Sequence, residues 1–154
     1  MRSELMTTIA RLPAMPAAAV QHVAEVEDVL LQKPQEAIGT IHMLHAGLYS
    51  RTVMIPAGIQ ITGALIKIPT MVVVDGDAYV WLGDKARRIK GHAVLPASAG
   101  RKQMFRANKD THITMIFATA ATTVDEAERE FTDEWEKLAS HRDPASNHVI
   151  VTGE

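Results

Sequence analysis

The spacing of apolar and polar residues predicts helices at both ends of the chain and strands between them. Residues 1–37 are helical in character: a short segment at 3–11 is stopped by Pro13, and Pro16 precedes a second helix at 17–33. In that second helix, valines and leucines recur every three or four residues and form an apolar stripe. This stripe must be buried against the rest of the chain or against another subunit.

From residue 38 to residue 121 the pattern changes to short β-type runs separated by Gly, Pro and Asp. Runs of this kind, at intervals of about ten residues, favour a sandwich or barrel over an α/β fold. Asp75, Gly76 and Asp77 are a strong turn signal and predict a hairpin there. The expected strands cover residues 48–55, 59–66, 70–74, 78–82, 86–95, 102–107 and 111–120.

Residues 122–142 predict an amphipathic C-terminal helix. Thr123 and Glu126 have the spacing of a capping box, and apolar residues then recur at helical intervals as far as Leu138. The tail at 143–154 is expected to be loose, with 148–152 as a candidate edge strand. The 154 residues therefore predict one mainly β domain with helical extensions.

Composition and charge narrow the possible functions. The chain has no cysteine, which excludes disulfides, thiolate metal sites and a cysteine nucleophile, and fits a reducing cytoplasm. We find no secretory signal and no apolar run long enough to cross a membrane, so we expect a cytoplasmic protein. The net charge of −2 and the few aromatic residues near the basic segment argue against a nucleic-acid partner.

The charges are unevenly distributed. Residues 85–109 contain eight Lys or Arg and no acid, whereas residues 110–136 contain eight acids and one base, Arg129. These segments could be two solvated faces. Alternatively, the acidic helix could pack over the basic strands, in the same subunit or in a partner.

The β region resembles the cupin superfamily, the RmlC-like jelly rolls, over roughly half the chain. The matching features are the strand at 49–55 entering Pro56-Ala57-Gly58, Gly63, the Asp-Gly-Asp segment and the loop at 96–100. More closely, residues 45–51 followed by 56–58 resemble small cupin-like proteins of tailed bacteriophage and prophage genomes. The resemblance implies a cupin-like jelly-roll β-barrel or sandwich that forms a homodimer or a higher homo-oligomer.

The usual metal ligands of that family are missing. Cupins hold a divalent ion with two or three His and one Glu. Those places correspond to residues near Ile66 and Thr70 and to a position at or beside Gln103. No His, Asp or Glu occurs at 60–74 or at 93–109. The sequence therefore predicts a degenerate metal site and no cofactor.

Several polar residues in the predicted strands could still line a cavity. If they point inward, they would suit a small anionic ligand such as a carboxylate, a phosphate or a sugar acid. These candidates are Tyr49, Arg51, Lys67, Lys102 and Gln103. We favour a non-enzymatic binding or structural module, because the usual metal ligands are absent.

Two enzymatic alternatives remain. A metal-independent isomerase or epimerase would use His112 as base and Tyr49 as acid, and requires both side chains in one pocket. A metal-dependent dioxygenase or isomerase would need a relocated site at His42, His45 and His112, with His92 as a further candidate. His42 and His45 are three residues apart, which places them on opposite faces of an extended segment.

Overall fold

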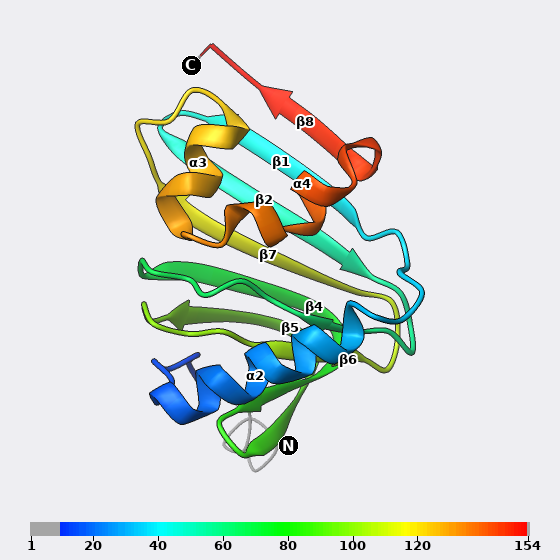
Figure 1. Cartoon of the computed structure of the whole chain (residues 1–154). Helices are drawn as coiled ribbons and strands as arrows, with labels where there is room; N and C mark the ends of the chain where they lie inside the picture. Colours follow the sequence, from blue (N-terminus) through cyan, green and yellow to red (C-terminus); the bar gives the residue numbers. More distant parts are fainter. Residues whose placement is uncertain (1–9, 154) are drawn as a thin grey trace.

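The computed structural model describes residues 10–153, and its strands form one curled sheet with the helices on the concave side (Figure 1). The predicted mainly β class is confirmed. The strands are β1 (Gly39–His45), β2 (Leu48–Ile55), β3 (Gln60–Thr62), β4 (Thr70–Leu82), β5 (Lys85–Ala97), β6 (Met104–Ala107), β7 (Thr111–Ala118) and β8 (Asn147–Val151). The helical elements are α2 (Ala17–Leu30), α3 (Val124–Phe131), η1 (Trp135–Lys137), α4 (Ala139–Arg142) and η2 (Pro144–Ser146).

The long strand β4 connects the two parts of the sheet. Along its whole length β4 pairs with β5, while its other edge pairs first with β7 and then with β6. From β7 the sheet continues through β2 and β1 to β8, and from β6 it continues to β3. All these pairs are antiparallel except β1 with β8. Alternate residues of each strand point to the concave side and form the core.

The predicted hairpin at Asp75-Gly76-Asp77 is wrong, because these residues lie inside β4. Gly76 has a φ of 146°, a conformation that side chains other than glycine rarely adopt. A Cβ atom at this position would lie 2.8 Å from the Cα of Thr111. The glycine therefore allows a close approach of β7, and the chain reverses later, between Leu82 and Lys85.

The predicted C-terminal helix begins where expected but is broken. Thr123 accepts a hydrogen bond from the Glu126 amide at 3.2 Å, as its capping position predicts. The helix α3 then ends at Phe131, because Thr132 is extended and its hydroxyl donates to the carbonyl of Leu65 at 2.7 Å. Two short helical turns, η1 and α4, follow in place of a continuous helix.

Other element boundaries also differ from the predictions. The second strand, expected at 59–66, is only three residues long, and β1 was not predicted as a strand. The tail forms the edge strand β8 beside β1 at 147–151, which confirms the candidate edge strand predicted at 148–152. The helix predicted at 17–33 ends at Leu30. Most of the segment predicted at 3–11 lies outside the described residues.

Two apolar clusters fill the concave side. One lies under α3 and α4, where Phe131 and Leu138 pack with Leu44 and Phe117 of the sheet. The other lies under the N-terminal part of the chain and includes Leu12 with residues of β4, β5 and β7. Among residues 10–153, no helix has the length and apolar character needed to span a membrane.

Candidate functional site

A cavity of about 830 Å³ lies on the concave side of the sheet. This volume is typical of small-molecule sites. Its walls come from the sheet, from the end of α2 with the segment after it, and from η1 and α4. Most of the sheet residues that line it are apolar, including Val53, Ile61, Val72, Phe105 and Ile113.

The extended segment at 100–103 supplies the cavity with two of its polar groups. It runs beside residues 63–66, with the Ile66 amide donating to the Arg101 carbonyl at 2.9 Å and the Gly63 amide to that of Gln103 at 2.7 Å. Successive side chains of an extended segment point to opposite sides. Arg101 and Gln103 therefore line the cavity, and Lys102 points away from it.

Arg101 is a buried cation without a carboxylate partner in the described part of the chain. Its side chain donates to the Ser98 carbonyl and to the Thr70 hydroxyl, each at 2.7 Å, and the residue is 3% exposed. Burial lowers the pKa of Arg101 to about 10. A buried charge with only neutral partners is costly, and an anion would relieve that cost.

Gln103 adds an unused hydrogen-bond donor to the same wall. The residue is 6% exposed. Its Nε2 is the one buried side-chain nitrogen or oxygen atom without a hydrogen-bond partner in residues 10–153. Buried polar groups normally have partners, so this amide indicates a place for a ligand acceptor.

Arg51 also lines the cavity, but its charge is compensated. Its Nη1 lies 2.9 Å from Glu128 Oε2, and both side chains are buried. Arg51 faces Met115 across the β2–β7 ladder, and the Met115 sulfur lies 3.9 Å from Arg101 Nη2. The two arginines therefore lie on either side of Met115, and only Arg101 lacks a carboxylate.

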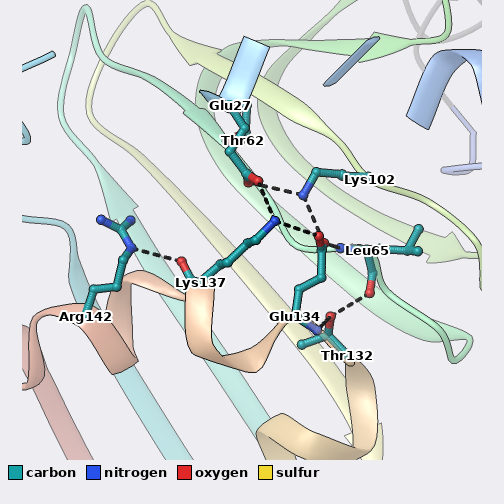
Figure 2. Close-up of polar contacts among 8 residues, drawn as sticks. All are labelled: Glu27, Thr62, Leu65, Lys102, Thr132, Glu134, Lys137 and Arg142. Carbon is teal, nitrogen blue, oxygen red and sulfur yellow. Dashed lines mark hydrogen bonds and ion pairs between the residues drawn. The ribbon is translucent and has the colours of Figure 1, made fainter. Parts of the chain in front are cut away.

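Lys102 lies at the centre of a buried ion-pair cluster on the opposite side of the segment (Figure 2). Its Nζ is 3.1 Å from Glu27 Oε2 on α2 and 2.9 Å from Glu134 Oε1 before η1. The Leu65 amide donates to the same Glu134 oxygen at 2.7 Å, and Thr62 donates to Glu27 at 3.2 Å. This cluster joins three segments that are far apart in the sequence.

The Lys102 cluster also bears on the predicted contact between acidic and basic segments. Lys102 belongs to the basic segment and Glu134 to the acidic one, so the two segments do meet within one chain. Elsewhere in the basic segment, Arg88 pairs with Asp77 of β4 instead, with Arg88 Nη2 2.6 Å from Asp77 Oδ2. The predicted packing of the acidic helix over the basic strands is therefore confirmed only at Lys102.

Some of the predicted ligand-binding residues line the cavity and others do not. Arg51 and Gln103 line the cavity, as expected. Lys102 is paired with the carboxylates of Glu27 and Glu134. Lys67 lies at the surface beside Asp133. Tyr49 is fully buried in the core, where its ring stacks on Phe131 and meets Phe117 edge to face. These last three residues do not line the cavity, and a ligand contact for them stays a prediction.

Arg101 is not among the predicted ligand-binding residues, although the sequence contains a signal for it. Lys102 and Gln103 are both predicted to line the cavity, yet adjacent residues of an extended segment cannot face the same side. Once Gln103 is placed in the cavity, the alternation selects Arg101 as its neighbour there. The charge of Lys102 favours it as an anion ligand, but the alternation of the segment places Arg101 in the cavity instead.

The relocated metal site is also contradicted. His42 is buried, with Nδ1 2.7 Å from the Tyr49 hydroxyl and Nε2 3.0 Å from Asn147 Oδ1. Burial is the main cause of a lowered pKa at His42. His45 lies on the other face of β1, and His112 and His92 are exposed. These imidazoles do not converge, and no cluster of three potential ligands occurs in residues 10–153.

The proposed acid–base pair of Tyr49 and His112 fails for a similar reason. Tyr49 points to the concave side, whereas His112 is exposed on the convex side of the sheet. Burial also raises the pKa of Tyr49 to about 12, which disfavours loss of its proton. The two side chains share no pocket, so this pair cannot act on one substrate.

Comparisons with known proteins give likenesses in structure only. No model of a known family matches the sequence. No curated protein matches it either. Similar solved structures include KdgF from Halomonas sp., with 18% identity over 62% of this chain and 90% of that one, at a TM-score of 0.47.

Two other similar structures are named as cupins. One is a cupin domain of an XRE family transcriptional regulator from Enterobacter cloacae, with 10% identity over 56% of this chain and 100% of that one, at a TM-score of 0.45. The other is an RmlC-like cupin protein from Desulfovibrio desulfuricans, with 17% identity over 56% and 90%, at 0.44. At these scores the likenesses say nothing about activity, ligand or partner. The resemblance to phage proteins stays a prediction.

Proposed function

We propose that the chain is a non-enzymatic, cupin-like binding protein whose cavity takes a small ligand with an anionic head. The observation that carries the proposal is the uncompensated guanidinium of Arg101 beside the unpaired amide of Gln103. A guanidinium presents parallel N–H groups that match the two oxygens of a carboxylate. The Gln103 amide would donate a further hydrogen bond to the same head.

The rest of the cavity indicates the body of the ligand. Apolar side chains of β2, β4, β6 and β7 line its wall, and they gain most from contact with hydrocarbon. A ligand with a charged head and an apolar body would satisfy both parts of the wall. We therefore favour an amphipathic carboxylate over a sugar acid or an inorganic phosphate.

The distribution of titratable groups favours binding over acid–base catalysis. No histidine is among the described residues that line the cavity. The carboxylates that line it come from the helical segments and the loops beside them, and Glu27 among them is already paired with Lys102. An acid–base mechanism would have to use Glu36, Glu136 or Asp143, the other carboxylates that line the cavity.

Isothermal titration calorimetry with octanoate tests the proposal, with octan-1-ol as the uncharged probe of the same length. We expect octanoate to bind more tightly than octan-1-ol. The variant Arg101→Met should lose about 10- to 100-fold in octanoate affinity, the range for a charge-assisted hydrogen bond. Lys67→Met removes a surface cation that does not line the cavity and is the matched control.

The calorimetry can also refute the proposal. If octanoate bound no better than octan-1-ol, the cavity would have no anion site. If Arg101→Met and Lys67→Met both kept the wild-type affinity for octanoate, the carboxylate would bind elsewhere.

A further inference from the structure

Most of the cations in the basic segment at 85–109 lie at the surface. Two of them do not, because Arg101 lines the cavity and Lys102 lies in the buried ion-pair cluster. The others are exposed and lie on β5, on β6 or just after β6: Lys85, Arg87, Arg88, Lys90, Arg106 and Lys109. Among residues 10–153, only Arg88 of this group has a carboxylate partner. The remaining charges are therefore uncompensated in the part of the chain that the structure describes.

The strand register places aromatic rings beside these cations, where β6, β4 and β5 lie next to one another (Figure 1). Tyr79 of β4 is paired with Arg106 of β6 on one side and with Arg88 of β5 on the other. Residues directly opposite one another in antiparallel strands share a face, and their Cβ atoms are about 5 Å apart. Trp81 is two residues further along β4, so it lies on the same face, about 7 Å from Tyr79.

A third cation extends this face. Lys90 is paired with Asp77, two residues before Tyr79 on β4, and so lies on the side of the strand that carries Tyr79. The face is turned away from the core, because Ala78 and Val80, which alternate with the aromatic residues, are 0% exposed. Its cations are exposed and its two rings are half-buried. We call the following residues the basic aromatic face: Tyr79, Trp81, Arg88, Lys90 and Arg106.

The carboxylates near the basic aromatic face do not cancel its charge. Asp77 is 3% exposed, and it already accepts two hydrogen bonds from Arg88, at 2.6 and 2.9 Å. Asp75 and Asp84 are exposed at the margins of the face, where the uncompensated cations outnumber them. An excess of positive charge therefore surrounds the two rings.

Rings alternating with cations on a sheet face suit a single-stranded nucleic acid. Its bases stack on aromatic side chains, and its phosphates bind Arg and Lys. An acidic peptide would use the cations but would gain little from the two rings. Few aromatic residues lie near the basic segment in the sequence, but strand pairing brings Tyr79 directly between two of its arginines. The local charge of the face, and not the net charge of −2, decides what binds there.

We infer that the basic aromatic face binds single-stranded nucleic acid. Tyr79 and Trp81 stack on bases, and Lys90 and Arg106 contact phosphates. None of the residues of this face lines the cavity. The inference is therefore independent of the anionic ligand proposed for Arg101, and the two can be tested separately.

Fluorescence anisotropy of a labelled oligothymidylate of about twelve nucleotides, within the site sizes of single-strand binders, tests the inference on the full chain. We expect saturable binding that weakens as the salt concentration rises. Tyr79→Ser should weaken binding by about 10-fold, within the range for loss of one stacked base. Tyr79→Phe keeps the ring and should bind like the wild type.

Arg106→Met tests the phosphate contact. The slope of the logarithm of the association constant against the logarithm of the salt concentration should become shallower by about 0.7, the value for one phosphate contact on a single strand. Lys67→Met removes a surface cation outside the face and is the matched control, with the affinity and slope of the wild type. Arg106 is exposed, so this variant keeps the test valid even if circular dichroism shows that Tyr79→Ser is unfolded.

Several outcomes would overturn the inference. One is a wild-type protein that binds neither oligothymidylate nor oligouridylate of the same length. Another is a folded Tyr79→Ser variant with the wild-type affinity, since the rings would then have no role. A third is polyglutamate that displaces the labelled strand as well as unlabelled oligothymidylate does, which would indicate an acidic protein as the partner. Tighter binding of oligouridylate than of oligothymidylate would support the inference and identify RNA as the preferred strand.

Discussion

The segment at 100–103 contains two buried cations, Arg101 and Lys102, which differ in the partners that surround them. Lys102, whose side chain does not line the cavity, meets two carboxylates, whereas Arg101, which lines the cavity, meets only a carbonyl and a hydroxyl. The two residues are neighbours in the sequence and are equally buried. The ammonium group of Lys102 therefore holds parts of the fold together, whereas the guanidinium of Arg101 is free for a ligand.

The Lys102 side explains how the helical ends are fixed to the sheet. Glu27 comes from the N-terminal helix and Glu134 from the C-terminal segment, and both reach the same ammonium group (Figure 2). Lys137 lies 3.5 Å from Glu134 and 3.8 Å from Glu27, and so adds a second, more exposed cation. The cluster is a saturated network with little capacity for a further partner.

The largest expected effect is on stability. Lys102→Met would leave Glu27 and Glu134 close together without the cation between them, and should cost about 3–5 kcal/mol in the free energy of unfolding. Arg101→Met removes a cation that has no carboxylate, and should stay within about 1 kcal/mol of the wild type. Urea denaturation of both variants measures this difference. Equal losses of unfolding free energy in the two variants would mean that Arg101 stabilises the fold as much as Lys102 does, and would contradict the proposed difference between them.

Ligand binding should stabilise the protein only through Arg101. At an octanoate concentration of about 100 times its dissociation constant, the wild type should gain about 2.7 kcal/mol. Arg101→Met should gain much less at the same concentration. Thermal or urea denaturation with and without octanoate gives both values. A full gain in Arg101→Met would contradict the assignment of the head site.

A smaller effect is expected at Gln103. Gln103→Leu removes one neutral hydrogen bond to the ligand, worth about 0.5–1.5 kcal/mol, and should weaken octanoate binding by about 2- to 10-fold. The same change removes an unpaired buried amide, so the unliganded protein should be as stable as the wild type or more stable. Calorimetry and urea denaturation test the two halves of this prediction. A clear loss of stability without ligand would mean that the amide already has a structural partner.

The smallest expected effect is the acid dependence contributed by Glu134. Burial alone would raise the pKa of this carboxyl, but the Leu65 amide and the Lys102 ammonium outweigh it and hold the pKa below its usual value of 4.5. A lowered carboxyl pKa stabilises the folded state above the unfolded-state value, and this contribution disappears as the pH falls through the folded-state pKa. As the pH falls below about 5, Glu134→Gln should therefore lose less unfolding free energy than the wild type. Urea denaturation at several pH values tests this, and parallel curves for the two proteins would contradict it.

Sequence patterns predicted those elements whose signals are local. The limits of β2 and the cap at Thr123 follow from alternation and from capping geometry, and both are confirmed. Asp75-Gly76-Asp77 has the composition of a turn. Its role depends on contacts distant in the sequence, because Thr111 approaches Gly76 and Arg88 binds Asp77. A local propensity cannot show such contacts.

The candidate site was predictable only in part. The polar residues in the β region indicated a cationic cavity, and Arg51 and Gln103 do line one. The sequence could not show that Glu128 would compensate Arg51, since that carboxylate comes from α3, 77 residues away. It also could not show that Glu27, on a face expected to be apolar, would be buried against Lys102. The pairing of charges is a tertiary property, and it decides which cation is left for a ligand.

The most direct measurement of the central claim is the ¹⁵N NMR signal of the Arg101 Nε–H group during an octanoate titration. Arg101→Met identifies this signal by its disappearance. We predict that it shifts along the same saturation curve as the calorimetric binding, because the guanidinium holds the carboxylate. An Arg101 signal that stayed unchanged while octanoate bound would contradict the claim that this uncompensated cation is the anion site.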